Sequence, residues 1–242
     1  MVNTVVLGRC ANDEYVQQSK QYGEIDIYLA LILYVLMITE FLILGKLFVI
    51  KDSELTETFV FITTGITSLS IIGFVLLFCI IRKQKLTTLG FSMSKAKESL
   101  RLGLMILALV AVIGCIWVNI TGSSFQTDAN IILMRFIYFL IFIGFMEELV
   151  FRAYIGTRFY GFFSNKRLSI IVVGIMWSLS HVPFYMMGTQ ISLFNYISLH
   201  WVNLLRIFVI HCGFQRLYSK YNSIIAPTIL DFIINFIQWF II

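Results

Sequence analysis

Long runs of apolar residues, separated by short polar stretches, follow one another from residue 27 to the end of the chain. A helix needs roughly 20 mostly apolar residues to cross a bilayer. The pattern therefore predicts an all-α fold, a polytopic membrane helix bundle of about seven transmembrane helices. The expected spans are Ile27–Leu47, Thr58–Ile81, Leu102–Ile120, Ile131–Phe151, Leu168–Met187, Tyr196–Phe214 and Ile224–Ile242.

Two polar regions stand out from these runs. Residues 1–26 have no apolar core of signal-peptide length, so we expect a polar cytoplasmic N-terminal segment before a transmembrane bundle over residues 27–242. Before the third span, Lys95, Lys97 and Arg101 alternate with apolar positions, and Ser92 or Ser94 can cap a helix. This predicts a short cytoplasmic amphipathic helix on anionic headgroups, with a solvated linker as the alternative.

Composition and charge support a membrane protein. Hydrophobic residues make up 59% of the 242 positions and charged residues 13%, against about 25% charged in a soluble domain. The net charge of +5 does not indicate nucleic acid, because Lys and Arg gather in alternate loops, after the second, fourth and sixth spans. The positive-inside rule places the N-terminus in the cytoplasm. We expect a multi-pass protein of a bacterial cell membrane.

Three groups of polar residues interrupt the apolar runs. Charged residues inside a span are costly and usually face the bundle interior, where they have a function. Glu147 and Glu148 are adjacent, and Arg152 lies four residues after Glu148, on the same helix face. The pair indicates a functional acid centre, and a structural Glu–Arg bridge is the alternative.

The other two groups lie in later spans at similar depth. His181 follows Trp177 by one helical turn, and Asp231 and Asn235 share one face of the last span. Each could simply satisfy polar groups in the bundle. Their common depth with the two glutamates favours one shared site.

These motifs resemble those of the CPBP family (CAAX protease and bacteriocin-processing, also called Abi). The resemblance covers residues 86–235, which we expect to be a protease-like core, and rests on Glu147-Glu148-x-x-x-Arg152 and an aromatic-x-x-x-His181 pattern. It implies an intramembrane endopeptidase whose glutamate and histidine activate water. In this family a last His-x-x-x-Asn pair stabilises the oxyanion or, in an older interpretation, binds metal.

The chain departs from the family pattern at one essential position. Asp231 stands where the family has histidine, and Trp177 replaces phenylalanine conservatively. An ionised Asp231 would repel an oxyanion. It could act in protonated form, or could bind a divalent metal such as Zn together with Glu148 and His181. His211, in the preceding span, could also take over the missing role.

The main hypothesis is a CAAX-type intramembrane peptidase that acts on a membrane-associated peptide or protein near the cytoplasmic leaflet. Glu147 or Glu148 would be the general base, His181 its partner and Arg152 the counter-ion, while Asn235 with Asp231 would hold the carbonyl. The alternatives are a non-catalytic membrane protein of bacteriocin self-immunity or regulation and, third, a proton-coupled transporter.

Overall fold

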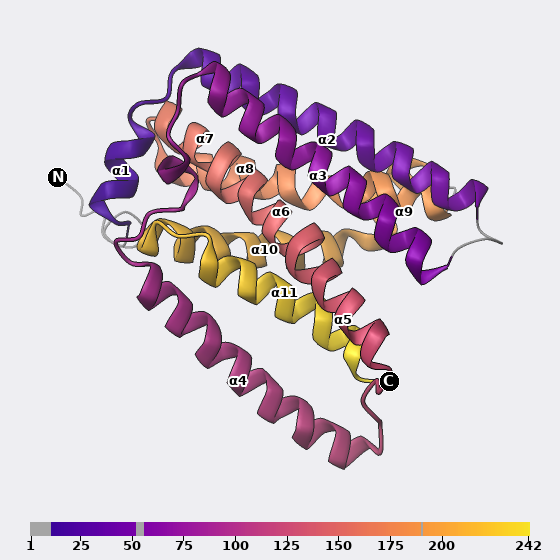
Figure 1. Ribbon diagram of the computed structural model, residues 1–242. Helices are drawn as coiled ribbons and strands as arrows, with labels where there is room; N and C mark the ends of the chain where they lie inside the picture. The colour runs from indigo at the N-terminus through magenta and orange to yellow at the C-terminus, as the bar shows by residue number, and fades with distance from the viewer. Residues whose placement is uncertain (1–10, 52–55, 190) are drawn as a thin grey trace.

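The computed structural model describes residues 11–51, 56–189 and 191–242, and the described chain is all-α (Figure 1). The first ten residues of the predicted N-terminal segment lie outside this range. The elements are α1 (Asp13–Ser19), α2 (Glu24–Ile50), α3 (Glu57–Ile81), η2 (Leu86–Leu89), α4 (Ala96–Thr121), α5 (Ala129–Ile137), η3 (Tyr138–Phe145), α6 (Met146–Glu148), η4 (Leu149–Gly156), α7 (Thr157–Phe162), α8 (Lys166–Ser180), α9 (Val182–Thr189), α10 (Leu193–Tyr221) and α11 (Ile225–Phe240).

Six helices in the described part of the chain are long and apolar enough to cross a membrane, so the chain is an integral, multi-pass membrane protein. They are α2, α3, α4, the continuous helix Ala129–Phe162, the pair α8 and α9 to Met187, and α10. The seventh predicted span corresponds to α11, which has only 16 residues. The count of about seven spans is therefore not confirmed.

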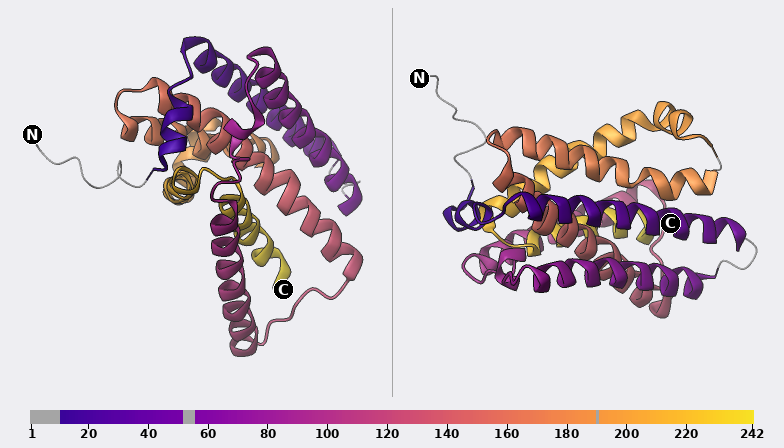
Figure 2. Two further views of the ribbon diagram at one scale, coloured as in Figure 1. Left: turned by 60° about the vertical axis from the view of Figure 1, so that its left-hand side comes forward. Right: turned by 90° about the horizontal axis from the view of Figure 1, so that it is seen from above.

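The helix from Ala129 to Phe162 forms the centre of the bundle (Figures 1 and 2). Its α5 end carries no buried residue, whereas every residue of η4 is buried. Aromatic and aliphatic residues of α2, α3 and α8 pack around η4 to form the main hydrophobic core. Glu147 and Glu148 therefore lie where this helix passes from its partly exposed half into its fully enclosed half.

Two π-helical stretches, η3 and η4, flank the acidic pair. A π turn leaves carbonyls without ideal partners, and such turns occur frequently at functional sites. Side chains meet two of these carbonyls: the Ser68 hydroxyl donates to Phe142 O at 2.6 Å, and Thr157 donates to Ala153 O at 2.6 Å. The local widening is thus supported by neighbouring polar groups.

A break between α8 and α9 positions His181. The nitrogen of Pro183 carries no hydrogen, so it cannot continue the hydrogen-bond series of α8, and it is tolerated only in the first turn of α9. His181 consequently lies at the C-cap of α8 with its N–H directed to Ser178 O. The proline therefore ends α8 at the residue that carries the imidazole.

The predicted amphipathic helix before the third span is wrong as a separate element. The basic segment is the first part of α4, which starts at Ala96 and continues unbroken to Thr121. Ser92 and Ser94 do not cap it, because their hydroxyls donate to the Glu14 carboxylate of α1, at 2.9 and 2.7 Å. The two serine hydroxyls therefore bind the Glu14 carboxylate instead of capping α4.

The last helix, α11, packs against α4 and η3. At Gly144 of η3 an added Cβ would lie 3.1 Å from Thr228 O and 3.3 Å from Phe232 N, so the two backbones are in close contact. At Gly103 of α4 an added Cβ would lie 2.7 Å from Cδ1 of the Ile229 side chain. These glycines let α11 approach the central helix, which places Asp231 and Asn235 beside it.

One end of the bundle collects most of the basic residues of the connections, and we call it the basic end. There α3, α7 and α10 end and α4, α8 and α11 begin. The basic residues in or beside these connections are Arg82, Lys83, Lys85, Lys95, Lys97, Arg158, Lys166, Arg167, Arg216 and Lys220. The connection 122–128 lies at the opposite end, where Ser124 pairs with Ile242 at the C-terminus.

Candidate functional site

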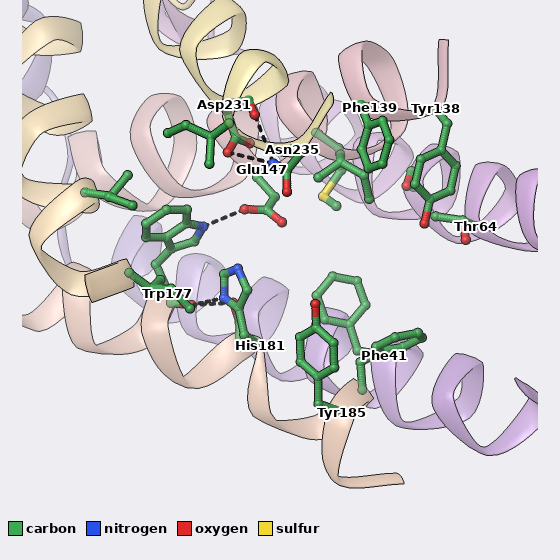
Figure 3. Close-up of a pocket in the computed structure, with 18 of the residues that line it drawn as sticks. Phe41, Thr64, Tyr138, Phe139, Glu147, Trp177, His181, Tyr185, Asp231 and Asn235 are labelled. Carbon is green, nitrogen blue, oxygen red and sulfur yellow. Dashed lines mark hydrogen bonds between the residues drawn. The ribbon is translucent and has the colours of Figure 1, made fainter. Parts of the chain in front are cut away.

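A cavity of about 300 Å³ lies between the central helix and α2, α3, α8 to α11. Four of the six predicted site residues line it, namely Glu147, His181, Asp231 and Asn235. Their side chains come from the central helix, the end of α8 and α11, and Figure 3 shows them converging on one space. Residues 84 positions apart in sequence, 147 to 231, thus share one site.

Trp177 fixes the position of the Glu147 side chain in the cavity. The indole Nε1–H donates a hydrogen bond to Glu147 Oε2 at 2.7 Å. Figure 3 shows the carboxylate between the indole, to its left, and the Asp231–Asn235 pair, above it. A phenylalanine could not donate this bond, so the tryptophan fixes the acid in a way that the usual family residue would not.

His181 is held by its Nδ1 atom, which lies 2.9 Å from the carbonyl oxygen of Trp177. A carbonyl only accepts, so in a hydrogen bond Nδ1 carries the hydrogen. In the neutral ring Nε2 is then a free acceptor. Because His181 lines the cavity, it can offer a basic nitrogen there.

Asp231 and Asn235 form a local pair on α11. The Asn235 amide donates to Asp231 O at 2.9 Å and, less closely, to Asp231 Oδ1 at 3.3 Å. The other carboxyl oxygen of Asp231, Oδ2, is buried and has no hydrogen-bond partner among the described residues. The pair therefore offers the cavity both an amide donor and a carboxyl group with unused hydrogen-bonding capacity.

Glu148 and Arg152 lie behind this surface instead of on it. Both side chains are fully buried, and Arg152 Nη1 contacts Glu148 Oε1 at 3.0 Å. The guanidinium also lies over the Trp177 ring, 4.1 Å from its centroid. The ion pair therefore supports the indole that holds Glu147, and the two adjacent glutamates occupy different environments.

Comparison with known families identifies the segment that holds this site. Residues 129–237 match the family model described as type II CAAX prenyl endopeptidase Rce1-like. The chain carries an Rce1-like domain. All six predicted site residues lie within its bounds. The family implies an intramembrane protease with a protein substrate. Neither the curated proteins nor the solved structures include a match.

The predicted metal ligands do not fit a shared ion in this Rce1-like domain. Glu148 is turned away from the cavity and paired with Arg152, while His181 and Asp231 line it. Within the described residues, no group of three His, Cys, Asp or Glu side chains is placed to hold a metal ion. We therefore derive no step through a metal.

Other polar residues of the spans separate into two groups. His211 is buried behind Trp177, with ring centroids 5.8 Å apart, and does not line the cavity. It therefore does not take over the role vacated at Asp231. Asn203 and Arg206 of α10 do line the cavity of the Rce1-like domain. Both lie within the predicted sixth span, but no short spacing links them to the motifs.

Two other charges within the spans, Glu40 and Arg135, have local explanations. Glu40 accepts a hydrogen bond from Ser70 at 2.7 Å. Arg135 forms an ion pair with Glu57 near the end of the bundle opposite the basic end. Both are therefore inter-helix contacts and contribute nothing to the cavity of the Rce1-like domain.

Proposed function

We propose that the chain is an intramembrane endopeptidase that hydrolyses a peptide bond of a membrane-associated peptide or protein, which enters from the cytoplasmic leaflet. One observation carries the proposal: of the two adjacent acids, Glu147 faces the cavity beside His181, whereas Glu148 is paired with Arg152. A carboxylate and an imidazole on one cavity are the groups that activate water for attack on a carbonyl.

In the proposed reaction a water molecule lies between Glu147 and Nε2 of His181. Glu147 accepts a proton from the water as its oxygen forms a bond to the carbonyl carbon. The imidazole orients the water through Nε2. When the tetrahedral intermediate collapses, the C–N bond breaks, and the proton held by Glu147 passes to the departing amine. The products are an amine and a carboxylic acid, which loses the second proton of the water to the amine or to solvent, and the base is regenerated.

The oxyanion of this intermediate needs a donor, and Asn235 is the proposed one. Its longer contact, 3.3 Å to Asp231 Oδ1, is the one that a developing oxyanion can replace. Asp231 supports this step only as a neutral carboxyl group, which can itself donate a hydrogen bond. As an anion it would oppose the charge that forms.

Replacement of Glu147 by Gln tests the assignment. The amide keeps the size of the side chain and can still accept from Trp177, but it cannot take a proton, so we expect cleavage to fall by at least about 100-fold. Mass spectrometry of membrane peptides from cells with each variant measures the products. The matched control is Glu98→Gln, which makes the same change at an exposed position of α4 outside the cavity. Unchanged products in Glu147→Gln and in His181→Gln would contradict the proposal.

Asp231 gives the rival function its only specific support. A protein that protects or regulates by binding alone, as in bacteriocin self-immunity, has no need of an oxyanion site. Its protection would survive Glu147→Gln as long as the protein inserts normally. Loss of protection in Glu147→Gln, with the protein present at the wild-type level, would favour the peptidase.

A further inference from the structure

Tyr185 of α9 is a hydrogen-bond donor of the cavity that the proposed reaction does not use. Its side chain lines the same space as Glu147 and His181, and its phenol lies within electrostatic range of the Glu147 carboxylate. It follows His181 by four residues, beyond the break at Pro183. In Figure 3 the phenol oxygen points from the wall formed by α9 into the cavity. The hydroxyl therefore lies where a bound peptide would contact it.

The packing of α9 on α2 holds the Tyr185 ring in place. At Gly45 of α2 an added Cβ would lie only 2.9 Å from Phe184 O, so the two backbones are in close contact. The Phe184 ring contacts the Phe48 ring of α2, with centroids 5.5 Å apart. The Tyr185 ring meets the Phe184 ring edge to face at the same centroid distance, an arrangement that aromatic pairs favour. The phenol therefore belongs to a packed wall, as a preorganised donor requires.

The oxyanion of the proposed reaction has one assigned donor, the amide of Asn235. An oxyanion has lone pairs for more than one hydrogen bond, and each preorganised donor counts for more where water is excluded. Asp231 can add a second donor only when it is protonated. A phenol ordinarily keeps its hydrogen near neutral pH, so Tyr185 can donate without any change of protonation.

Other hydroxyl groups of the cavity are differently engaged. The hydroxyls of Ser68 and Ser180 donate to backbone carbonyls, at 2.6 and 2.7 Å. Figure 3 shows the Tyr138 hydroxyl beside Thr64, away from the proposed reacting side chains. Of the two tyrosines that line the cavity in the described chain, Tyr185 is therefore the one whose hydroxyl faces the reacting groups.

We infer that Tyr185 is a second oxyanion donor, whose hydroxyl acts together with the Asn235 amide. This inference rests on the proposed function and adds a catalytic residue to it. Asn235 comes from α11 and Tyr185 from α9, and Figure 3 shows them above and below the Glu147 carboxylate. A carbonyl oxygen held between them can receive both hydrogen bonds as its charge grows. The phenol keeps its proton throughout, so the proton transfers remain those of Glu147.

A mimic of the tetrahedral intermediate tests this role without cleavage. The full-length protein carries Glu147→Gln, whose neutral amide stands for the protonated acid of the intermediate, and is placed in phosphatidylcholine nanodiscs. The probes are a library of apolar decapeptides in which a tetrahedral, anionic phosphinate replaces the central peptide bond. The reference library has the same sequences with a neutral ketomethylene group. We expect the phosphinates to bind at least about 100-fold more tightly, as two charge-assisted hydrogen bonds would give.

Single variants of this parent protein then assign the preference for the phosphinate. Tyr185→Phe removes the hydroxyl and keeps the ring, so the preference should fall at least about tenfold, as the loss of one charge-assisted hydrogen bond predicts. The matched control Tyr138→Phe makes the same change elsewhere in the cavity and should keep the full preference. A parent protein without the preference, an undiminished preference in Tyr185→Phe, or an equal loss in Tyr138→Phe would overturn the inference.

Cleavage by the protein with Glu147 intact separates this inference from the proposed function. If both hold, Tyr185→Phe should lower kcat for the cleaved membrane peptides about 100-fold and leave KM within about threefold, because the hydroxyl binds a charge that develops only in the transition state. Equal cleavage by Tyr185→Phe and the wild type would overturn the inference and leave the peptidase intact. A phosphinate preference that depends on Tyr185, in a protein that cleaves nothing, would disprove the peptidase alone.

Discussion

At the scale of single residues, the two glutamates differ in what surrounds them. Glu148 and Arg152 are completely buried and paired, whereas Glu147 is partly exposed on the cavity. Removing one partner of a buried ion pair leaves an uncompensated charge in a medium that solvates it poorly. Glu148, which looks equivalent to Glu147 in the sequence, should therefore have a structural role.

We predict that Glu148→Ala lowers the free energy of unfolding by about 3–5 kcal/mol, because Arg152 is left buried without a counter-charge. Glu147→Ala should cost much less, since it breaks no ion pair. Denaturant titration of the purified protein in detergent measures both. The double variant Glu148→Met/Arg152→Met should recover most of the loss, because it removes both charges. Equal destabilisation by the two single variants would show that the pair has no special role.

Of the six predicted site residues, four line the cavity, and the sequence did not distinguish the positions of the two glutamates. Glu147 and Glu148 point about 100° apart on a helix, so spacing shows that only one can face a given cavity without saying which. The choice depends on Trp177, whose indole bonds one acid and covers the counter-ion of the other. Arg206 shares no short motif with these residues, and only the packing of α10 brings it to the cavity.

At the scale of elements, the close contact of α11 with the central helix decides the geometry at Asp231 and Asn235. We predict that Gly144→Val reduces cleavage by tenfold or more, because its side chain would press on the α11 backbone at Thr228 and Phe232. The control is Gly73→Val in α3, where no described atom lies within 4 Å of an added Cβ. Activity at matched protein level is the measurement, and equal activity in both variants would refute this role.

A second element-scale contact joins α1 to the segment before α4. Hydrogen bonds from Ser94 and then from Ser92 lower the pKa of Glu14, which outweighs the opposite effect of burial. A lowered folded-state pKa stabilises the fold above the ordinary value of 4.5, and this stabilisation disappears as the pH falls below it. The carboxylate is partly exposed, so the effect should not exceed about 1 kcal/mol.

We therefore expect the melting temperature of the wild type to fall more steeply than that of Glu14→Gln between about pH 6 and pH 3.5. Thermal denaturation in detergent across this range measures the difference. Glu98→Gln, at an exposed position of α4, is the matched control and should follow the wild type. A Glu14→Gln curve parallel to the wild type would exclude the stabilising role of this contact.

Apolar periodicity located the long helices well but not their internal structure. The run that predicts a span at Ile131–Phe151 belongs to a helix that extends to Phe162, because the apolar residues after Arg152 continue it into the core. The π stretches around Glu147 depend on partners such as Ser68, which belongs to another helix. The serines before α4 have cap-like spacing, and only the tertiary position of Glu14 removes them from that role.

At the scale of the whole molecule, the two described ends of the chain lie at opposite ends of the bundle (Figure 1). Because an odd number of crossings would place the ends in this way, we predict that α11 crosses the membrane as a seventh span. At 1.5 Å per residue its 16 residues span about 24 Å, less than the roughly 30 Å of a hydrocarbon core. Extended residues at its end and local thinning of the bilayer can cover the remainder.

We predict that the basic end faces the cytoplasm and the connection 122–128 faces outward. Single cysteines at the exposed positions Lys97 and Thr127, in a background with the native cysteines replaced by serine, report each side. A membrane-impermeant maleimide added to intact cells should label Thr127→Cys, and should label Lys97→Cys only after the membrane is permeabilised. The reverse pattern would invert the topology, and labelling of both sites in intact cells would show that the short α11 does not enforce a single orientation. With the expected pattern, Glu147, His181 and Arg206 would each lie 15 residues (162 − 147, 181 − 166 and 221 − 206), or roughly 22 Å, from the cytoplasmic end of their helix. A substrate from that side must therefore enter the membrane before it can be cut.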